Sequence, residues 1–590
     1  MHGFRGVGAS PGIAIGRVFV HVPPSLAVSD ATVPAALRQA EVESFLQGRQ
    51  KALVGFESLI DKVRAEKGDD LAGVFEGHAE ILMDEELGEA IVGRIRDDGQ
   101  SALAAVRDAM EAQRAEFLAL DDEYLRQRAD DLSDIGRRLM LAIAGVEEVR
   151  LEDLPKGSIV VAQDLGPSDT ARLDRDRVAG FVVAAGGRTS HVAIMARTLE
   201  LPAVVGCADI FDVATSGQVI ALDGGDGRVM VDPDAEALAD FECRRAAHAT
   251  AMEAMRALSP LPATTGDGHR AFLGVNIGTP ADAEAALPWN PDGVGLYRTE
   301  FLFMNRTGLP SEEEQYRAYA AVVRAMKGRP VVIRTLDVGG DKPVDGLGFT
   351  REDNPFLGWR GARLFLYGSD GAIPNRDPEV KQQMEAQLSA VLRAAVDGNV
   401  WLMYPMISSV EEVDVLRQQQ DDVRARLAAA GRQVGQIRTG IMIETPGAAL
   451  VADKLAEKVD FFSIGSNDLT QYTLAADRGN GRIAPVYQPF HPGVWRLIAG
   501  VIKAARRRAI PVGLCGELAG IEEAALPLLG LGLDEYSMAA PTLPRIKRII
   551  RAATMPEAEA IARAILDAPT AAAALAMAGD AMRAVLGRVQ

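Results

Sequence analysis

The C-terminal half of the chain alternates short, apolar, β-branched runs with segments of helical composition. Each run is followed by enough residues for a helix. The candidate strands cover residues 272–277, 293–297, 331–336, 400–404, 439–444, 461–465, 511–515 and 534–538. Eight successive strand–helix units predict a (β/α)8 TIM barrel, although a doubly wound sheet would give the same alternation.

The region between residues 35 and 148 contains no proline and is rich in Ala, Leu, Glu, Arg and Asp. Its apolar residues recur at three- and four-residue steps, as in Leu53, Phe56, Leu59, Ile60 and Val63. This spacing places apolar side chains on one face of a helix. The region is therefore predicted to be a helical domain of four or more helices.

Short β-branched runs flank this helical region on both sides. One covers residues 13–20, and the others follow at 158–161, 181–183, 202–205, 218–220 and 228–231. Gly and Asp turns separate them, which is typical of a small α/β domain. If the first run joins the same sheet, the helical domain is an insertion. Residues 234–258 are again helical and charged, and Ser259-Pro260-Leu261-Pro262 ends this linker helix.

The chain has 590 residues, and single hydrophobic cores stop growing at roughly 250–300 residues, so several domains are required. A multidomain α/β protein is expected. Its parts are a small α/β domain at 1–30 and 146–232, an inserted helical domain at 31–145, a linker helix at 233–260, a C-terminal TIM barrel at 261–575 and a tail at 576–590.

The formal net charge of −19 disfavours nucleic acid or an anionic membrane as the main partner. Cys207, Cys243 and Cys515 lie far apart, which predicts neither a disulfide framework nor a metal knuckle and favours a reducing compartment. The N-terminus does not read as a signal peptide, and no apolar run approaches the roughly 20 residues that span a bilayer. We therefore expect a cytoplasmic protein without a membrane partner.

Polar residues gather where the predicted barrel strands end, which is the side on which barrel enzymes work. They are Arg298, Arg334, Arg478, Glu444, Asn467, Asp468 and Cys515. Arginines bind phosphate and carboxylate groups bidentately, and two carboxylates from neighbouring strands suit Mg²⁺. The implied ligand is a small phosphorylated carboxylic acid, although such charges can also be solvated or paired with one another. Cys515 is either a small buried apolar residue or a proton donor, and the residues alone do not decide.

His191 follows a Gly-Gly turn at 186–187 and lies at the predicted start of a helix. The N–H groups and the dipole at a helix N-terminus favour an anion and oppose imidazolium, which leaves a ring nitrogen free as a nucleophile. A phosphorylated histidine is therefore one interpretation. A capping or core histidine is the other.

Three stretches resemble the motifs of a known family. They are GRTSHVAIMAR at residues 187–197, DFFSIGSNDLTQY at 460–472 and GVGASPG at 6–12. The first resembles the phosphohistidine signature of enzyme I, the phosphoenolpyruvate–protein phosphotransferase of the bacterial phosphotransferase system. The others resemble its second signature and its opening. The resemblance runs from near the N-terminus to about residue 575.

The resemblance implies a role for each site residue. His191 resembles the phosphorylated histidine. Arg298, Arg334 and Arg478, with Asn467 and Asp468, resemble the residues that bind phosphoenolpyruvate; Glu444 and Asp468 resemble the Mg²⁺ ligands; and Cys515 resembles the residue that protonates the pyruvate carbon. The family passes the phosphoryl group to the carrier protein HPr, which docks on the helical insertion, and it dimerises through the barrel. Residues 75–78 and 84–87 resemble part of the docking surface.

Two further enzymes remain as alternatives. A nitrogen-branch phosphotransferase is disfavoured because no sensory domain is expected before Gly6. A phosphoenolpyruvate synthase or dikinase needs an ATP-binding domain, for which the chain offers no stretch, and Ser190 stands where those enzymes typically have Cys. A non-catalytic relay that only senses phosphoenolpyruvate is a third possibility, which the intact set of Arg298, Arg334, Glu444 and Asp468 disfavours.

Overall fold

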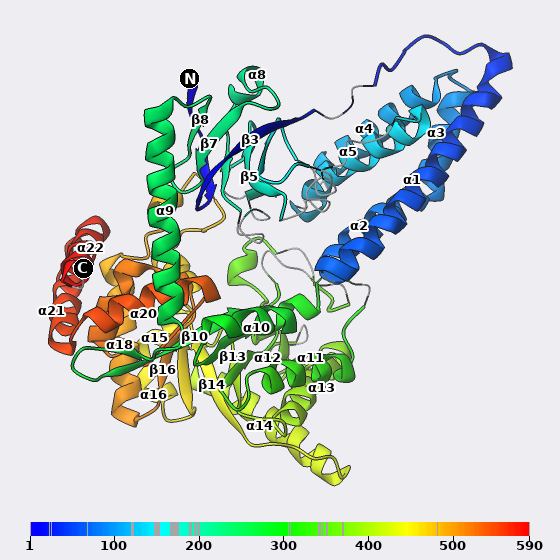
Figure 1. Ribbon diagram of the computed structural model, residues 1–590. Helices are drawn as coiled ribbons and strands as arrows, with labels where there is room; N and C mark the ends of the chain where they lie inside the picture. The colour runs from blue at the N-terminus through cyan, green and yellow to red at the C-terminus, as the bar shows by residue number, and fades with distance from the viewer. Residues whose placement is uncertain are drawn as a thin grey trace. The chain divides into compact units, whose positions relative to one another are not determined.

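The computed structural model describes residues 2–22, 24, 26–67, 69–119, 123–146, 151, 154–165, 176–187, 192–193, 196, 201–304, 306, 308–339, 344, 346–349, 352–368, 371–480 and 482–588. The chain divides into two compact units, Met1–Ala251 and Met252–Gln590 (Figure 1). Each unit has its own hydrophobic core.

The first unit contains an eight-stranded sheet with the strand order β1-β8-β7-β3-β4-β5-β6-β2 among the described residues. The strands are β1 His2–Arg5, β2 Val7–Ser10, β3 Ile13–His21, β4 Ser158–Ala162, β5 Val178–Val183, β6 Ala203–Val205, β7 Val219–Asp223 and β8 Arg228–Val231. Strand β3 pairs in parallel with β4 and antiparallel with β7. Because β3 precedes the helical region and β4 follows it, that region is inserted into the sheet domain, as the sequence predicts.

The insertion consists of helices packed around an aromatic and aliphatic core. They are η1 Ala35–Leu37, α1 Arg38–Lys67, α2 Asp69–Met83, α3 Glu85–Arg96, α4 Ala102–Ala119 and α5 Glu123–Ala144. Phe45, Phe56 and Phe75 are buried in this core. The side chain of Asp84 accepts a hydrogen bond from Leu87 N at 3.1 Å and so caps α3, which separates α3 from α2. The predicted helical domain is thus observed.

Helix α9, Ala235–Leu258, follows the sheet and the short helix α8, Ile210–Val213. Its N-terminal half packs on the sheet through Phe241, which is buried against Ala221 and Met230. Just beyond its C-terminal end, the buried Lys547 donates a hydrogen bond to Ser259 O at 2.7 Å. A cation at this end of a helix also interacts favourably with the helix dipole. The linker helix that the sequence predicts is present.

The second unit is a closed barrel of parallel strands. They are β10 Arg270–Ile277, β11 Gly293–Arg298, β12 Val331–Arg334, β13 Val400–Tyr404, β14 Ile437–Ile443, β15 Phe461–Ile464, β16 Val512–Leu514 and β17 Glu535–Met538, with the short strand β9 Ala263–Thr264 pairing antiparallel to β10. Each strand pairs with the next, and β10 pairs with both β11 and β17. This closure excludes the doubly wound sheet and establishes the predicted TIM barrel.

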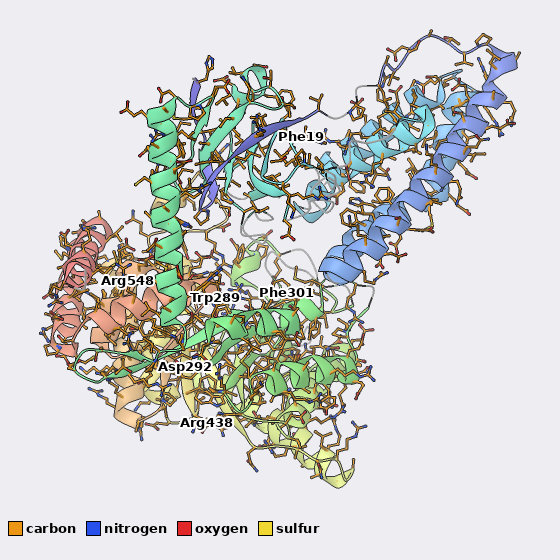
Figure 2. All side chains as sticks on the ribbon, in the orientation of Figure 1. Phe19, Trp289, Asp292, Phe301, Arg438 and Arg548 are labelled. Carbon is orange, nitrogen blue, oxygen red and sulfur yellow. The ribbon has the colours of Figure 1, made fainter. Side chains whose placement is uncertain are left out.

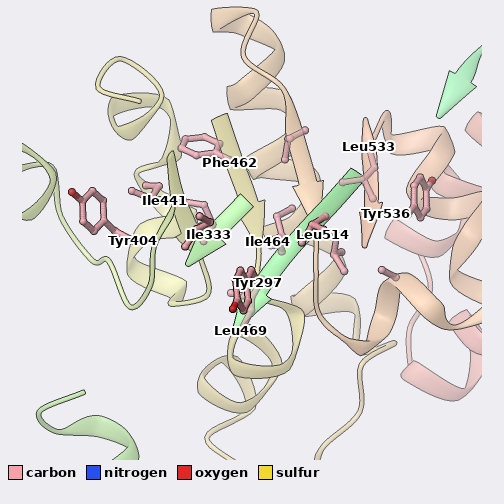
Figure 3. Close-up of a cluster of buried hydrophobic side chains, with 14 of the residues drawn as sticks. Tyr297, Ile333, Tyr404, Ile441, Phe462, Ile464, Leu469, Leu514, Leu533 and Tyr536 are labelled. Carbon is pink, nitrogen blue, oxygen red and sulfur yellow. The ribbon is translucent and has the colours of Figure 1, made fainter. Parts of the chain in front are cut away.

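Helices surround the strands and bury the outer face of the barrel. They are α10 Pro280–Ala286, α11 Glu312–Ala325, α12 Arg363–Leu366, α13 Pro378–Ala394, α14 Val410–Ala429, α15 Pro446–Leu450, α16 Ala452–Leu455, α17 Ser466–Leu474, α18 Pro492–Arg508, α19 Ala525–Leu531 and α20 Leu543–Ala552. Short 3₁₀ turns are η3 Leu287–Trp289, η4 Thr299–Leu302, η5 Pro355–Leu357, η6 Ala484–Val486, η7 Glu517–Gly520, η8 Glu522–Ala524 and η9 Ala540–Thr542. Figure 3 shows part of the resulting core, with Ile333, Phe462 and Tyr536 buried.

Two C-terminal helices, α21 Met555–Leu566 and α22 Ala571–Gly587, extend the barrel core. Ala574, Ala578 and Val585 of α22 are buried in the same cluster as the barrel strands. Arg588 pairs with Glu557 at 2.6 Å and ties the end of α22 to α21. The boundary expected at residue 575 therefore falls inside a packed helix, because Ala-rich sequence conceals an apolar face.

The inside of the barrel is filled by side chains. Leu296, Met403, Met442 and Phe461 pack there with Cys515. Phe301, which is labelled in Figure 2, lies on η4 just after β11. Its side chain is 52% exposed. Among the described residues, no helix combines the length and apolar character needed to cross a membrane.

Candidate active site at the carboxyl ends of the barrel strands

The barrel brings most of the predicted site residues to one end. Arg298 and Arg334 are the last residues of β11 and β12, and these two residues are paired in the sheet register. Glu444 follows β14 directly, and Cys515 follows β16. Asn467 and Asp468 lie in the first turn of α17, directly after β15. Because all barrel strands are parallel, their carboxyl ends form one mouth, which we call the barrel mouth.

Three arginines at the barrel mouth differ in their partners. Arg334 is buried and forms ion pairs with Glu300 and, at 2.9 Å, with Asp337. The guanidinium groups of Arg298 and Arg478 have no ion-pair partner among the described residues. The pKa of Arg298 is lowered, first by desolvation and then by the positive charges of Arg334 and Arg478. The barrel mouth therefore holds cations that an anionic ligand would stabilise.

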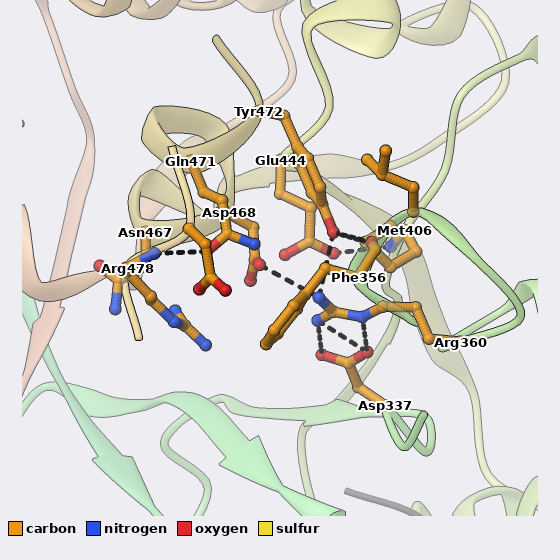
Figure 4. Close-up of polar contacts among 12 residues, drawn as sticks. Asp337, Phe356, Arg360, Met406, Glu444, Asn467, Asp468, Gln471, Tyr472 and Arg478 are labelled. Atoms are coloured by element: carbon orange, nitrogen blue, oxygen red, sulfur yellow. Dashed lines mark hydrogen bonds and ion pairs between the residues drawn. The ribbon is translucent and has the colours of Figure 1, made fainter. Parts of the chain in front are cut away.

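Arg360 is a central residue of the site that sequence analysis missed. Its guanidinium is buried and bonds to three groups: Asp468 Oδ1 at 3.2 Å, Tyr472 OH at 3.1 Å and Asp337 Oδ2 at 3.2 Å (Figure 4). It lies in the long loop after β12, so no strand end marked it. What marks Arg360 is its burial between carboxylates, and a sequence does not show burial or contacts.

Glu444 and Asp468 form a carboxylate pair beside Arg360. Glu444 is fully buried, and one of its oxygens accepts a hydrogen bond from Met406 N at 2.6 Å. Burial raises the pKa of Glu444 well above its usual value, and the negative charges of Asp468 and Asp337 raise it further against the opposing arginines. A bound cation would favour the ionised form of Glu444 and so offset the effects of burial and of the neighbouring negative charges.

The donor set fits a hard divalent cation. Among the described residues, no group of three or more His, Cys, Asp or Glu side chains is placed to enclose a metal ion. Glu444 and Asp468 supply only carboxylate oxygens, and Mg²⁺ typically takes one or two carboxylates and completes its shell with water and substrate oxygens. Glu444 and Asp468 match that requirement.

Hydrogen bonds fix the segment that carries Asn467 and Arg478. The side-chain oxygen of Asn467 accepts from Glu517 N at 2.9 Å, and its main-chain oxygen accepts from Tyr487 OH at 3.2 Å. Gln471 Oε1 accepts from Arg478 N at 3.1 Å, as Figure 4 shows. The first turn of α17 and the following loop are therefore held together, with Arg478 beside Asn467.

Cys515 lies at the inner edge of the barrel mouth and is buried beside Met442. Its main-chain oxygen accepts a hydrogen bond from Asn276 Nδ2 at 2.9 Å. Burial raises the pKa of the Cys515 thiol to about 11. The thiol is therefore protonated at neutral pH, as a proton donor to carbon requires.

His191 lies outside the described residues, so its role stays a prediction. Some residues on either side of it are described. Gly186, which follows β5, has a φ of 90°, a conformation that favours glycine. Val192 and Ala196 are buried in the sheet-domain core.

The two stretches that resemble the HPr-docking surface are partly buried. Phe75 and His78 lie inside the helical core. Glu76 is exposed and pairs with Arg64, while Glu85 and Glu86 are exposed in the first turn of α3. Only the acidic residues of these stretches are thus available to a partner.

Comparison with known proteins places this architecture in a class. Residues 5–128 match the family described as PEP-utilising enzyme, N-terminal; residues 154–227 match the mobile domain of these enzymes; and residues 252–555 match their PEP-binding domain. The fold, the barrel mouth and these matches define a phosphoenolpyruvate-utilising enzyme.

Curated relatives narrow the class to one family. A phosphoenolpyruvate-protein phosphotransferase of Haemophilus influenzae is 44% identical over 568 residues, which are 96% of this chain and 97% of that protein. Proteins of the same name from Priestia megaterium and Bacillus subtilis are 41% and 40% identical and cover 93% and 97% of this chain, and 93% and 98% of their own lengths. The chain belongs to the phosphoenolpyruvate-protein phosphotransferase family.

Proposed function

We propose that this enzyme transfers the phosphoryl group of phosphoenolpyruvate to His191 and then to a histidine of the carrier HPr, releasing pyruvate. This would be the first step of sugar uptake by the phosphotransferase system. The observation that carries the proposal is the position of Arg298 and Arg478, which have no ion-pair partner in the described part of the chain, beside the buried Glu444 and Asp468. Family membership supports it along the whole chain.

In this proposal the arginines hold both anionic ends of phosphoenolpyruvate. Arg298 and Arg478 are free to form bidentate hydrogen bonds with phosphate and carboxylate oxygens. Arg334 is fixed by Glu300 and Asp337, so it presents an oriented positive charge. Asn467, held by Glu517 N, adds an amide to the same side.

Glu444 and Asp468 would hold Mg²⁺, for which their oxygens fit. When bound, the ion would neutralise negative charge that develops on the enol oxygen. The chain's own residues do the rest. A ring nitrogen of His191 attacks phosphorus in line, and the bond from phosphorus to the enol oxygen breaks. The Cys515 thiol then gives its proton to the terminal carbon of the enolate, and pyruvate results.

The domain roles are part of the proposal. We assign residues 1–30 and 146–232 as the mobile domain that carries His191, 31–145 as the HPr-binding domain and 233–260 as the linker. The phosphoenolpyruvate-binding domain is the barrel from residue 261 together with α21 and α22, which pack on it. The exposed acids at the start of α3 suit a basic partner surface. A homodimer through the barrel and a cytoplasmic location complete the proposal.

Labelled phosphoenolpyruvate with Mg²⁺, in the absence of nucleotide, tests this function. We expect the wild-type chain to take up label and to pass it to HPr, and His191→Ala to take up none. An absolute need for ATP would favour a dikinase or synthase, and an unlabelled wild type would favour a non-catalytic sensor. Label that passes only to a nitrogen-branch carrier would favour that branch.

A further inference from the structure

A buried glutamine connects two barrel helices to the two arginine-bearing strands. Gln387 lies on α13 and is 1% exposed. Its side-chain oxygen accepts a hydrogen bond from Leu336 N at 2.9 Å. Its amide nitrogen donates to Thr299 Oγ1 at 3.2 Å and to Tyr319 OH at 3.1 Å. All polar atoms of this side chain are thus used.

The two hydroxyl groups that Gln387 contacts each donate a hydrogen bond to a further acceptor. Thr299 Oγ1 donates to Arg334 O at 2.9 Å, and Tyr319 OH donates to Gln315 Oε1 at 3.1 Å. Each donor therefore meets one acceptor, and a flipped Gln387 amide would place its nitrogen against the Leu336 N–H. A fully satisfied network of this kind has one arrangement and resists distortion.

The network ends at the residues that carry the barrel-mouth charges. Thr299 follows Arg298, the last residue of β11, and the bond from Thr299 to Arg334 O ties β11 to the last residue of β12. Leu336 precedes Asp337, which pairs with both Arg334 and Arg360. Among the described residues, the side chain of Gln387 bonds to the chain neighbours of these charged residues and not to their charged groups.

We propose that Gln387 is a positioning residue for phosphoenolpyruvate, because it fixes the ends of β11 and β12 and so holds Arg298 and Arg334 at one separation. The inference rests on the proposed function. A small displacement of a binding group lowers the reaction rate strongly, because the arginines must bind the phosphate and carboxylate oxygens at the same time. Tyr319 supports Gln387 from α11.

The barrel contains a matched glutamine that lies away from the barrel mouth. Gln420 on α14 is also buried, and its oxygen accepts from Thr439 Oγ1 at 3.0 Å and from Tyr404 OH at 3.4 Å. Thr439 lies near the amino end of β14, whereas Glu444 follows its carboxyl end. Gln420 is therefore a buried glutamine bonded to Thr and Tyr in the same barrel, but without a link to the arginine-bearing strand ends.

The test compares Gln387→Met with Gln420→Met in the full chain, using rapid-quench labelling from phosphoenolpyruvate. Both variants remove buried hydrogen bonds and should lower the Tm. Only Gln387→Met should reduce kcat/KM for phosphoenolpyruvate, by about 10- to 100-fold and mainly through KM. Phosphoryl transfer to His191 from phosphorylated HPr should keep its wild-type rate in both, because it does not use the barrel.

Wild-type kinetics in Gln387→Met would overturn the inference, and so would equal kinetic losses in both variants. If Gln387→Met does not fold, Thr299→Val replaces it, because this change keeps the shape of the side chain and removes the hydroxyl that joins Gln387 to Arg334 O. A wild-type KM in Thr299→Val would then overturn the inference. Failure of the proposed function is recognised separately, because the wild-type chain would take up no label, and the inference would fall with it.

Discussion

The two ends of the barrel are both rich in carboxylates but use them differently. At the amino end, aspartates accept hydrogen bonds from main-chain N–H groups of neighbouring strands: Asp292 from Leu273 at 2.9 Å, Asp460 from Thr439 at 2.7 Å and Asp534 from Val512 at 2.9 Å. One of these aspartates, Asp292, also pairs with the exposed Arg270 at 2.9 Å. At the barrel mouth, Asp337 and Asp468 pair with the buried side chains of Arg334 and Arg360. The first arrangement satisfies the backbone, whereas the second assembles charges that a ligand can use.

The comparison shows how the same residue type becomes structural at one end and functional at the other. An acid that caps a strand satisfies one N–H group and leaves little unused charge. At the barrel mouth, by contrast, Arg298 and Arg478 have no ion-pair partner among the described residues, and Glu444 has a raised pKa. Such arginines beside a buried carboxyl group whose pKa is strongly raised are the mark of a binding site.

Arg360→Met should have the largest effect. The substitution leaves Asp337 and Asp468 buried without this partner. Breaking such a buried ion pair lowers the free energy of unfolding by about 3–5 kcal/mol. Urea unfolding of the barrel measures the change, and uptake of label from phosphoenolpyruvate should be lost as well. The exposed Arg438, which stacks over Trp401 at the amino end, is the matched control. Equal stability losses in Arg360→Met and Arg438→Met would contradict the comparison.

Arg298→Met should reduce the rate of labelling by about 10²–10³-fold, the range seen when one preorganised electrostatic group is removed. The Tm should stay at its wild-type value, because Arg298 has no ion pair to lose among the described residues. Rapid-quench kinetics and thermal unfolding measure the two quantities. A fall in Tm with unchanged labelling would show that Arg298 is structural.

Glu535→Gln should change the pH dependence of stability. Glu535 lies at the amino end, and a Cβ on Gly295 would fall 2.1 Å from its Oε1, so glycine makes room for this carboxyl. Burial, followed by the charges of Asp534 and Asp292, raises the pKa of Glu535 from 4.5 to about 7.

The sign of the Glu535 effect follows from the direction of the shift. Between pH 4.5 and about 7, the folded chain keeps a proton that the unfolded chain releases. Stability therefore falls as pH rises through this window, by up to about 1.4 kcal/mol per pH unit, and is level above it. Urea unfolding of Glu535→Gln across the window should show a shallower slope than the wild type. Parallel slopes would contradict the assignment.

Asp534→Ala should have the smallest effect, a loss of about 1 kcal/mol, because it leaves the Val512 N–H without its acceptor. Asp534→Asn keeps an acceptor oxygen and serves as the control, with a smaller loss. Labelling should stay at the wild-type rate in both. Slower labelling in either variant would mean that the amino end also serves the reaction.

The sequence predicts the fold well because strand ends are visible in it. The apolar runs ending near Arg298, Arg334 and Glu444 mark strand termini, and parallel closure then brings these residues together. The sequence predicts the positions of Cys515 and Asp468 at the barrel mouth for the same reason. The helical insertion was predictable because its proline-free apolar pattern contrasts with the β-branched runs on both sides.

The rest of the site depends on contacts that sequence spacing does not encode. Arg360 comes from a long loop and reaches Asp468, 108 residues away in the chain. Gln387 comes from the middle of α13, where a buried glutamine looks like any helix residue. Acidic residues at the amino end and at the barrel mouth also look alike in the sequence. Only the positions and directions of the strands show to which end each one belongs. The role of His191 stays a prediction that rests on its motif.

Mass spectrometry of the chain after incubation with phosphoenolpyruvate and Mg²⁺ tests the central claim most directly. The account predicts one phosphoryl group on the imidazole of His191, transferable to HPr, and none in Arg298→Met over the same short time. A phosphoryl group on any other side chain, or an unmodified wild-type chain, would contradict it.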